Sequence, residues 1–347
     1  MFTWRALSLA ILGLLLCSDT WAATTVSRDS TPLTFLPFQE GTRVRIVQGN
    51  DENFSHSGTL VYSYDFDMGS NTNSRSNPIY GEPIYSPVRG IIRAVRTGAP
   101  DFSCNNSSSS CNNNGTGNAI SIQVDGTNYY VNLMHMQDGS IPSSIRVGRW
   151  VEQGDYLGNV GQSGFSSHPH LHMHLSTSAL GRSVAFDFVE VGNPDTDDWA
   201  ISMLAPTRYV IDNDRRANLG APISNPSAAT TGTFRRYSQT RTVVGDDYMV
   251  STSSSPYFYW YFTITNLDGY YNIYATCKGT TSRDDDAQYR VYGGGISRYT
   301  YFDQADFRYE WADLGRYGLN SSTRYTVRVH GSGDGSLCAD AIVIELD

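Results

Sequence analysis

The hydrophobic residues of this 347-residue chain fall largely in short runs, which are bounded by polar and turn-forming Gly, Pro, Asn and Ser. The runs are rich in the β-branched and aromatic residues that favour strands. Helical periodicity is almost absent, so we expect an all-β dominated fold. The clearest strands are predicted at residues 43–47, 90–95, 119–124, 129–133, 257–264, 270–275 and 325–329.

The length of the chain favours two folded domains, each large enough to bury its own core. We place the first at residues 23–207 and the second at residues 208–347, where histidines nearly disappear and tyrosine-rich strands begin. The spacing of these short strands by turns predicts a β-sandwich for the second domain. Residues 192–198 and 220–231 are rich in turn-forming and small polar residues, so we expect exposed connections there.

Residues 1–22 have the organisation of a secretory signal peptide. Arg5 precedes an apolar stretch that is too short to span a bilayer comfortably, and Thr20-Trp21-Ala22 fits a small-residue cleavage site. We expect cleavage after Ala22 and a mature protein that is secreted or periplasmic, with no membrane as a partner.

Four cysteines remain after that cleavage, an even number that favours two disulfides in an oxidising compartment. Three pairings are possible. We predict that Cys104 pairs with Cys111 and Cys277 with Cys338, because each pair then lies within one domain and can form as that domain folds. The formal net charge of −9 argues against nucleic acid as a partner.

Four of the seven histidines lie within residues 168–174. His170, His172 and His174 alternate with apolar residues, so the pattern predicts a strand with imidazoles on one face. Such a cluster is typical of a metal site. Two neighbouring imidazoles could both bind the metal, or one could bind the metal and the other its water, and the spacing does not choose between these. The alternative is a structural role, with the rings bonded to backbone groups.

A catalytic zinc usually takes three protein ligands and leaves one position open, so the cluster needs partners from elsewhere. The first half of the chain offers His56 in a turn-like segment, Asp65 between two aromatic residues, and His135 at the end of an apolar strand. Each has an ordinary structural explanation when taken alone. Their combination with the histidine cluster favours a metal site.

The order of these motifs resembles the lysostaphin-type zinc metallopeptidases, which cut peptide bonds in bacterial peptidoglycan. The resemblance covers roughly residues 56–175 and is carried by His56, Tyr64-Asp65-Phe66, residues 81–90, Gly117-Asn118, His135, residues 151–158, Gly161-Gln162-Ser163-Gly164 and His170-Leu171-His172. It implies a β-sheet peptidase domain with zinc (Zn2+) bound by His56, Asp65 and His172. It also implies that His135 and His170 lie beside the metal as catalytic histidines.

Two positions depart from that family pattern. The gap from His56 to Asp65 is longer than the short HxxxD form common in the family, so Asp67, on the same strand face, remains a rival ligand. His174 stands where many relatives have glutamate. It either supports a ligand or fills the strand face, and we favour the second interpretation.

The second domain resembles the C-terminal domain of golvesin and xanthan lyase, a carbohydrate-binding-like β-sandwich. The resemblance is carried by residues 210–214, 269–274, 311–315 and 339–343, and it contains no catalytic signature. Exposed aromatic side chains there could stack on sugar rings, although aromatic residues in strands more often belong to a core.

Together the two resemblances imply a secreted endopeptidase that acts on peptidoglycan, with zinc-activated water as the nucleophile and wall glycan as an additional candidate partner. The alternative is a non-catalytic cell-wall-binding or regulatory protein that keeps the peptidase fold. Release of new amino groups from purified cell wall would separate the two.

Overall fold

The computed structural model describes residues 23–26, 30–52, 55–103, 115–238, 244–245, 247–265, 267–306 and 311–347. In this part of the chain the structure is nearly all β, with one 3-10 turn, η1 (Gly58–Leu60), beside the strands. The predicted fold class is therefore confirmed. None of the described helical segments has the length and hydrophobicity that a membrane crossing needs. The predicted signal peptide and the predicted Cys104–Cys111 bridge lie outside the described residues.

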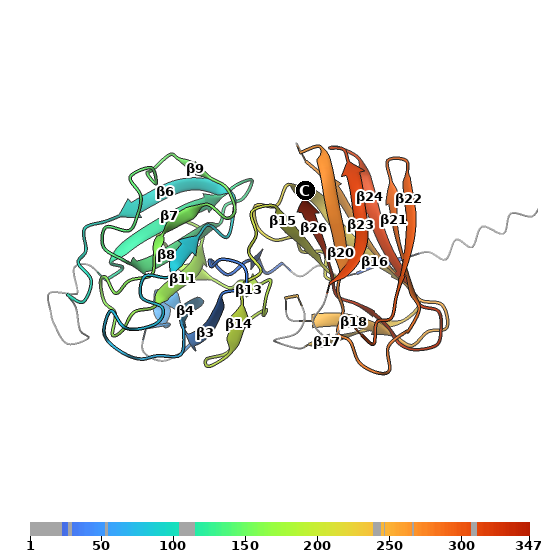
Figure 1. The fold of residues 1–347 in the computed structure, drawn as a ribbon, viewed down its shortest axis with the longest axis horizontal. Helices are drawn as coiled ribbons and strands as arrows, with labels where there is room; N and C mark the ends of the chain where they lie inside the picture. The colour runs from blue at the N-terminus through green and yellow to red at the C-terminus, as the bar shows by residue number, and fades with distance from the viewer. Residues whose placement is uncertain are drawn as a thin grey trace, which may run out of the picture.

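The first lobe is built on one antiparallel nine-stranded sheet, ordered β14-β3-β4-β11-β8-β7-β6-β9 with β12 beside β11 (Figure 1). The strands of this sheet are β3 (Arg43–Gln48), β4 (Ser63–Asp67), β6 (Gly90–Arg96), β7 (Asn118–Val124), β8 (Tyr130–Met136), β9 (Trp150–Val151), β11 (Leu171–Ser176), β12 (Ser183–Val184) and β14 (Trp199–Ile201). Two short pairs accompany it, namely β5 (Pro83–Tyr85) with β10 (Tyr156–Asn159) and β2 (Leu33–Thr34) with β13 (Asp187–Phe188).

The two faces of this sheet differ because side chains alternate along each strand. On β4, Tyr64 and Phe66 belong to the apolar core, so Asp65 between them lies on the opposite face. On β11 the apolar residues enter the same core, which places His172 opposite it. The strand register sets His172 between Asp65 of β4 and Met134 of β8. The predicted alternation thus gathers polar side chains at the middle of one sheet face.

The second lobe is a sandwich of a six-stranded sheet, ordered β1-β16-β19-β24-β21-β22, and a four-stranded sheet, ordered β15-β26-β20-β23 (Figure 1). The strands of the larger sheet are β1 (Thr24–Thr25), β16 (Ile223–Thr231), β19 (Tyr257–Ile264), β21 (Ala287–Gly293), β22 (Ile296–Phe302) and β24 (Arg324–His330). Those of the smaller sheet are β15 (Arg208–Asp212), β20 (Gly269–Ala275), β23 (Ala312–Leu319) and β26 (Ala341–Leu346). A third sheet contains β17 (Phe234–Ser238), β18 (Asp247–Ser251) and β25 (Leu337–Ala339). Large side chains from both main sheets fill the core, among them Phe258, Trp260, Phe262, Tyr271, Tyr289 and Tyr325.

The structure corrects one predicted connection. Residues 220–231, expected to be an exposed loop, contain strand β16, which pairs with β19. One of its small residues, Ala228, belongs to the sandwich core. Pro226 is tolerated because the register shifts at a bulge, where Asn225 adopts a φ of 53°. Turn-forming composition therefore marked an irregular strand rather than a loop.

The segment before the first lobe also departs from the expected domain range. Thr24 and Thr25 form β1 and pair with β16 of the sandwich. Val26 belongs to the apolar core of that same lobe. Residues 24–26 therefore belong structurally with the second lobe, although the sequence places them in the first domain.

The two lobes share an apolar cluster. Leu33, Phe35 and Val189 pack there with Val210 and Val343 of the sandwich. Hydrogen bonds extend the contact, because Gln153 Nε2 donates to the carbonyl oxygens of Ala205 at 2.6 Å and Arg208 at 2.8 Å. The lobes are therefore joined by a packed contact as well as by the connecting chain.

Cys277 and Cys338, which we predict to form a disulfide, are buried in the sandwich core. Both are free thiols in this structure, and they are hydrogen-bonded to each other. Burial and the contact with Cys338 raise the pKa of the Cys277 thiol well above its usual value. The bridge stays a prediction for the oxidised protein.

Candidate metal centre

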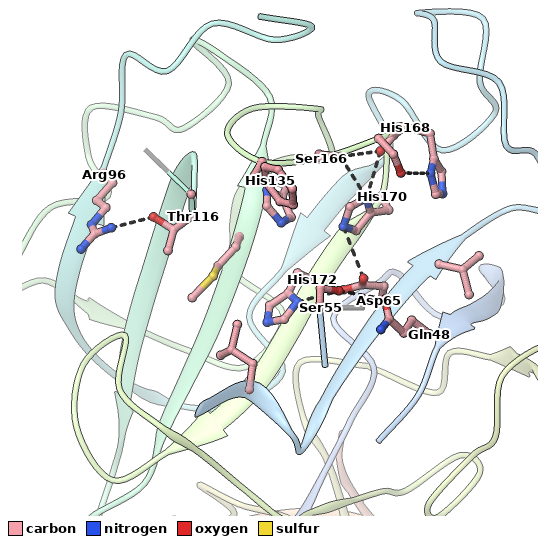
Figure 2. Close-up of a pocket in the computed structure, with 16 residues that line it drawn as sticks. Gln48, Ser55, Asp65, Arg96, Thr116, His135, Ser166, His168, His170 and His172 are labelled. Atoms are coloured by element: carbon pink, nitrogen blue, oxygen red, sulfur yellow. Dashed lines mark hydrogen bonds and ion pairs between the residues drawn. The ribbon is translucent and has the colours of Figure 1, made fainter. Parts of the chain in front are cut away.

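Three buried side chains from separate segments converge on the polar face of the nine-stranded sheet. His56 comes from the loop before η1, Asp65 from β4 and His172 from β11. One ligand atom from each residue lies within 4.8 Å of the other two. Figure 2 shows Asp65 and His172 facing each other, as the pairing of β4 with β11 requires.

His56 is fully buried, and the backbone holds its ring. Its Nδ1 lies 2.7 Å from the carbonyl oxygen of Gly49 and donates to it, which leaves a lone pair on Nε2. That Nε2 lies 3.2 Å from Asp65 Oδ1. It has no hydrogen-bond partner of suitable geometry among the described residues. A buried nitrogen without a partner is costly unless another species binds it.

Two successive hydrogen bonds orient His172. His174 Nε2 lies 3.1 Å from the carbonyl oxygen of Gly181 and donates to it, so His174 Nδ1 is an acceptor. His172 Nε2 lies 3.1 Å from that Nδ1 and donates to it. The other nitrogen of His172, Nδ1, therefore presents a lone pair 2.8 Å from Asp65 Oδ1. This corrects our preferred interpretation of His174, because it orients a predicted ligand rather than merely filling the strand face.

These bonds turn the lone pairs of two imidazoles toward one carboxylate. Such an arrangement is unfavourable unless a cation, either a proton or a metal ion, lies between the acceptors. Burial lowers the pKa of His172, and Asp65 offsets this only in part. Burial also lowers the pKa of His56, but the nearby Asp65 carboxylate outweighs this, and the net pKa is raised.

The carboxylate of this cluster stays ionised. Burial raises the pKa of Asp65, but the charge of His170 and the adjacent imidazoles of His172 and His56 outweigh burial and hold the pKa well below its usual value. An ionised carboxylate with two imidazole nitrogens is a donor set that zinc prefers. The unpartnered Nε2 of His56 is the observation that makes these residues fit a metal ion.

A bulge in β8 aims His135 at the cluster. Leu133 and Met136 both lie in the core, so the alternation breaks between them, and Met134 and His135 both line the site. The register between β7 and β8 shifts there. His135 has a φ of 63°, a left-handed conformation that non-glycine residues adopt rarely.

Hydrogen bonds to backbone carbonyls orient the two predicted catalytic histidines. His135 Nδ1 donates to the carbonyl oxygen of Ser163 at 2.8 Å, and His170 Nδ1 donates to that of His168 at 2.9 Å. Ser166 Oγ lies 3.1 Å from the same His170 nitrogen. The His135 and His170 rings are 4.8 Å apart between centroids. Each ring therefore has Nε2 as its second nitrogen for the site, and Figure 2 shows that of His170 linked to the Asp65 carboxylate, with His135 beside His170.

Asp67, the rival ligand, has another partner. The guanidinium of Arg45 binds its carboxylate with two hydrogen bonds, Nε to Oδ1 at 2.9 Å and Nη2 to Oδ2 at 2.7 Å. Asp65 has no arginine partner among the described residues, and its oxygens face the imidazoles. The geometry therefore favours Asp65 over Asp67.

The site opens into a cavity of about 620 Å³, whose lining includes four of the five predicted site residues. The fifth, His56, is not in that lining but contacts Asp65, which is. Sequence reasoning missed the groups that orient the rings, namely Gly49, Ser163, Ser166 and Gly181. Three of the four act through a carbonyl oxygen, which every residue has, so their side chains carry no signal of the role.

The β-sheet lobe, with a buried His-Asp-His cluster beside two further histidines, has the features of a metallopeptidase centre. Residues 76–185 match peptidase family M23, and residues 223–346 match the golvesin C-terminal domain. The chain therefore contains an M23 metallopeptidase domain, of the lysostaphin type, followed by a golvesin C-terminal domain. Both resemblances are confirmed. The M23 match begins after His56 and Asp65 but includes His135, His170 and His172.

Solved structures are similar to parts of the chain. The catalytic domain of the prophage-encoded M23 protein EnpA from Enterococcus faecalis has 21% identity and a TM-score of 0.30, over 44% of this chain and 94% of that one. The catalytic domain of lysostaphin from Staphylococcus simulans has 19% identity and a TM-score of 0.25, over 41% and 87%. Paenibacillus xanthan lyase has 15% identity and a TM-score of 0.34, over 93% of this chain but 26% of that one. A comparison with curated proteins gave no match.

Proposed function

We propose that this protein is a secreted or periplasmic zinc endopeptidase that hydrolyses peptide bonds in bacterial peptidoglycan. The observation that carries the proposal is the convergence of three lone pairs, on His56, Asp65 and His172, at one buried point. The M23 match supports peptidoglycan as the substrate. Two nitrogen donors favour zinc over magnesium or calcium, which prefer oxygen ligands. The signal-like residues 1–22 support export.

When bound, zinc would polarise the scissile carbonyl and lower the pKa of its water toward about 7. His170 would accept the proton of that water. Its Nδ1 donates to a backbone carbonyl, and its Nε2 lies 3.5 Å from Asp65 Oδ2, at the edge of the cluster. The same nitrogen could then return the proton to the leaving amine. No covalent enzyme intermediate is needed.

His135 would act as a neutral hydrogen-bonding group beside His170. Burial lowers the pKa of His135 to about 3, and the charges of His170 and His172 act in the same direction. Its Nδ1 is bonded to Ser163, so Nε2 can accept a hydrogen bond from water or from the leaving amine. The bulge in β8 would thus supply a fixed acceptor without adding a charge.

The test is the release of new amino groups from purified peptidoglycan by the mature protein. A zinc chelator should abolish the release, and added zinc should restore it. His170→Ala should lower the rate by about 10²- to 10⁴-fold, the usual contribution of a general acid or base. Mass spectrometry of the released fragments would identify the bond that is cleaved.

The alternative function has a distinct outcome in the same experiment. A wall-binding or regulatory protein would sediment with peptidoglycan and hold zinc but would release no amino groups. That result would remove the endopeptidase proposal and leave the fold and the metal site unchanged.

A further inference from the structure

The outward face of the six-stranded sheet carries an ordered array of tyrosine and arginine side chains, which we name the Tyr-Arg face. Its members come from four neighbouring strands, β19 with Tyr257, Tyr259 and Tyr261, β24 with Arg324, Arg328 and His330, β21 with Gln288, Arg290 and Tyr292, and β22 with Ser297, Tyr299 and Tyr301. On β19, β24 and β21 these residues alternate with core residues, which places them outside the sandwich. Figure 1 shows this sheet on the side away from the first lobe.

The tyrosines of this face are not part of the core. Phe258 and Trp260 fill the core side of β19, while Tyr257, Tyr259 and Tyr261 form a row on its outer side. Adjacent rings of the row are stacked, with centroids 6.0 Å and 5.9 Å apart. On the edge strand β22, Tyr299 is 50% exposed and Tyr301 is 53% exposed. The face therefore presents a strip of aromatic groups to solvent.

The charge on this face is positive, and within the described part of the chain it is not compensated by carboxylates. Strands β16, β19, β24, β21 and β22 contain no Asp or Glu, although the whole chain has a formal net charge of −9. Arg290, Arg324 and Arg328 donate to neutral side-chain oxygens, those of Ser297, Ser227 and Gln288. None of the three arginines pairs with a carboxylate within the described ranges. Acidic residues begin only beyond the strand ends, so the face is complementary to an anion.

The arginines are also held in place by the tyrosines. The guanidinium carbon of Arg324 lies 4.5 Å from the ring centroid of Tyr261, and that of Arg290 lies 5.0 Å from the ring centroid of Tyr299. A guanidinium that stacks on a ring keeps its N–H groups available for a carboxylate. Preorganised donors lower the entropy cost of binding.

We propose that the Tyr-Arg face binds a linear glycan that carries carboxylates. The inference rests on the proposed function, in which the substrate is a glycan with carboxylate-bearing peptides. A strip that crosses four strands fits an extended polymer better than a compact ligand. Tyrosine rings suit the apolar faces of sugar rings, and arginines suit the carboxylates.

The experiment measures sedimentation of the full mature protein with purified peptidoglycan in the presence of a zinc chelator, so that no hydrolysis occurs. Arg290→Gln combined with Arg328→Gln should weaken the apparent Kd about tenfold or more, since each change removes a charged hydrogen-bond donor. Tyr299→Ser combined with Tyr301→Ser should also weaken binding. Amidation of the carboxylates in the peptidoglycan should weaken binding of the unaltered protein by a similar factor.

The chain offers a matched control on the other sheet. Arg316 lies 4.0 Å over the ring of Tyr270 but is paired with the Asp347 carboxylate at 2.6 Å, so its charge is compensated. Arg316→Gln with Tyr270→Ser should leave the Kd within about twofold. All variants should unfold at nearly the same temperature, because the changed side chains are at least partly exposed.

Unchanged wall binding by both face variants, measured on folded protein, would overturn the proposal. If the protein binds double-stranded DNA as tightly as peptidoglycan, the face binds polyanions in general, and the glycan assignment is overturned. Both face variants should hydrolyse a small soluble peptide at the normal rate when zinc is present. Failure of the proposed function would appear as no hydrolysis by any variant, while the binding differences without zinc would persist.

Discussion

His174 gives the sharpest test of how the metal centre is oriented. In the structure its ring links His172 Nε2 to the carbonyl oxygen of Gly181 through two bonds of 3.1 Å. His174→Leu removes the acceptor and leaves the His172 N–H without a partner in a site that is almost fully buried. His172 can then carry its hydrogen on Nδ1, the nitrogen that we assign to zinc.

The expected loss in zinc affinity follows from the loss of the His174 acceptor and the move of the His172 hydrogen to Nδ1. A neutral hydrogen bond contributes about 1 kcal/mol, and a buried donor left unpaired costs about 1–3 kcal/mol. At about 1.4 kcal/mol per tenfold change, the Kd for zinc should rise about 10- to 100-fold. His174→Asn, whose amide oxygen can take the place of Nδ1, should stay within about threefold of the unaltered protein.

Competition with a chromophoric chelator at pH 7.5 measures these affinities directly and does not depend on catalysis. Each variant must first be shown to be folded, by its unfolding temperature in the absence of zinc. The reasoning is refuted if folded His174→Leu binds zinc as tightly as the unaltered protein. It is also refuted if His174→Asn and His174→Leu lose affinity equally.

Two further predictions concern stability. Burial raises the pKa of Glu190 from 4.5 to about 7, and hydrogen bonds from the N–H groups of Met203 and Leu36 offset this only in part. The folded protein therefore holds a proton on Glu190 that the unfolded chain has lost. The free energy of unfolding falls as the pH rises from about 4.5 through about 7. Glu190→Gln should remove up to about 3 kcal/mol of that fall. Urea unfolding of both proteins at pH 4.5 and pH 8 measures the difference. An equal pH dependence in the two proteins would contradict this prediction. In protein exported to an oxidising compartment, non-reducing peptide mapping should show Cys277 linked to Cys338, and the bridge should add about 4 kcal/mol for a loop of this length. A bridge from either cysteine to another part of the chain would oppose this pairing.

The sequence predicted the regular strands of the site better than the irregular ones. Alternation on β11 correctly placed the apolar residues in the core and His172 on the other face, because a period of two decides the face of a regular strand. The bulge that aims His135 into the site breaks that period, and its left-handed conformation has no marker such as glycine or asparagine. Irregular strands were therefore the places where the pattern was least informative.

The choice of ligands also depended on contacts between distant segments. Asp65 and Asp67 lie on the same strand face, and the structure distinguishes them by Arg45 of the neighbouring strand β3, which binds Asp67, and by the imidazoles that face Asp65. The role of His174 likewise depends on the carbonyl of Gly181, which a loop brings beside it. Such pairings come from the tertiary fold, and one sequence alone carries no record of them.

Metal content of three purified variants would test the assignment of the centre. The unaltered protein, His170→Ala and His135→Ala should each retain about one zinc per chain after dialysis, because neither His170 nor His135 belongs to the set of His56, Asp65 and His172. His172→Ala should lose the metal, since it removes one of three ligands. Retention of zinc by folded His172→Ala together with its loss from folded His170→Ala would contradict the account and exchange the roles of the two histidines.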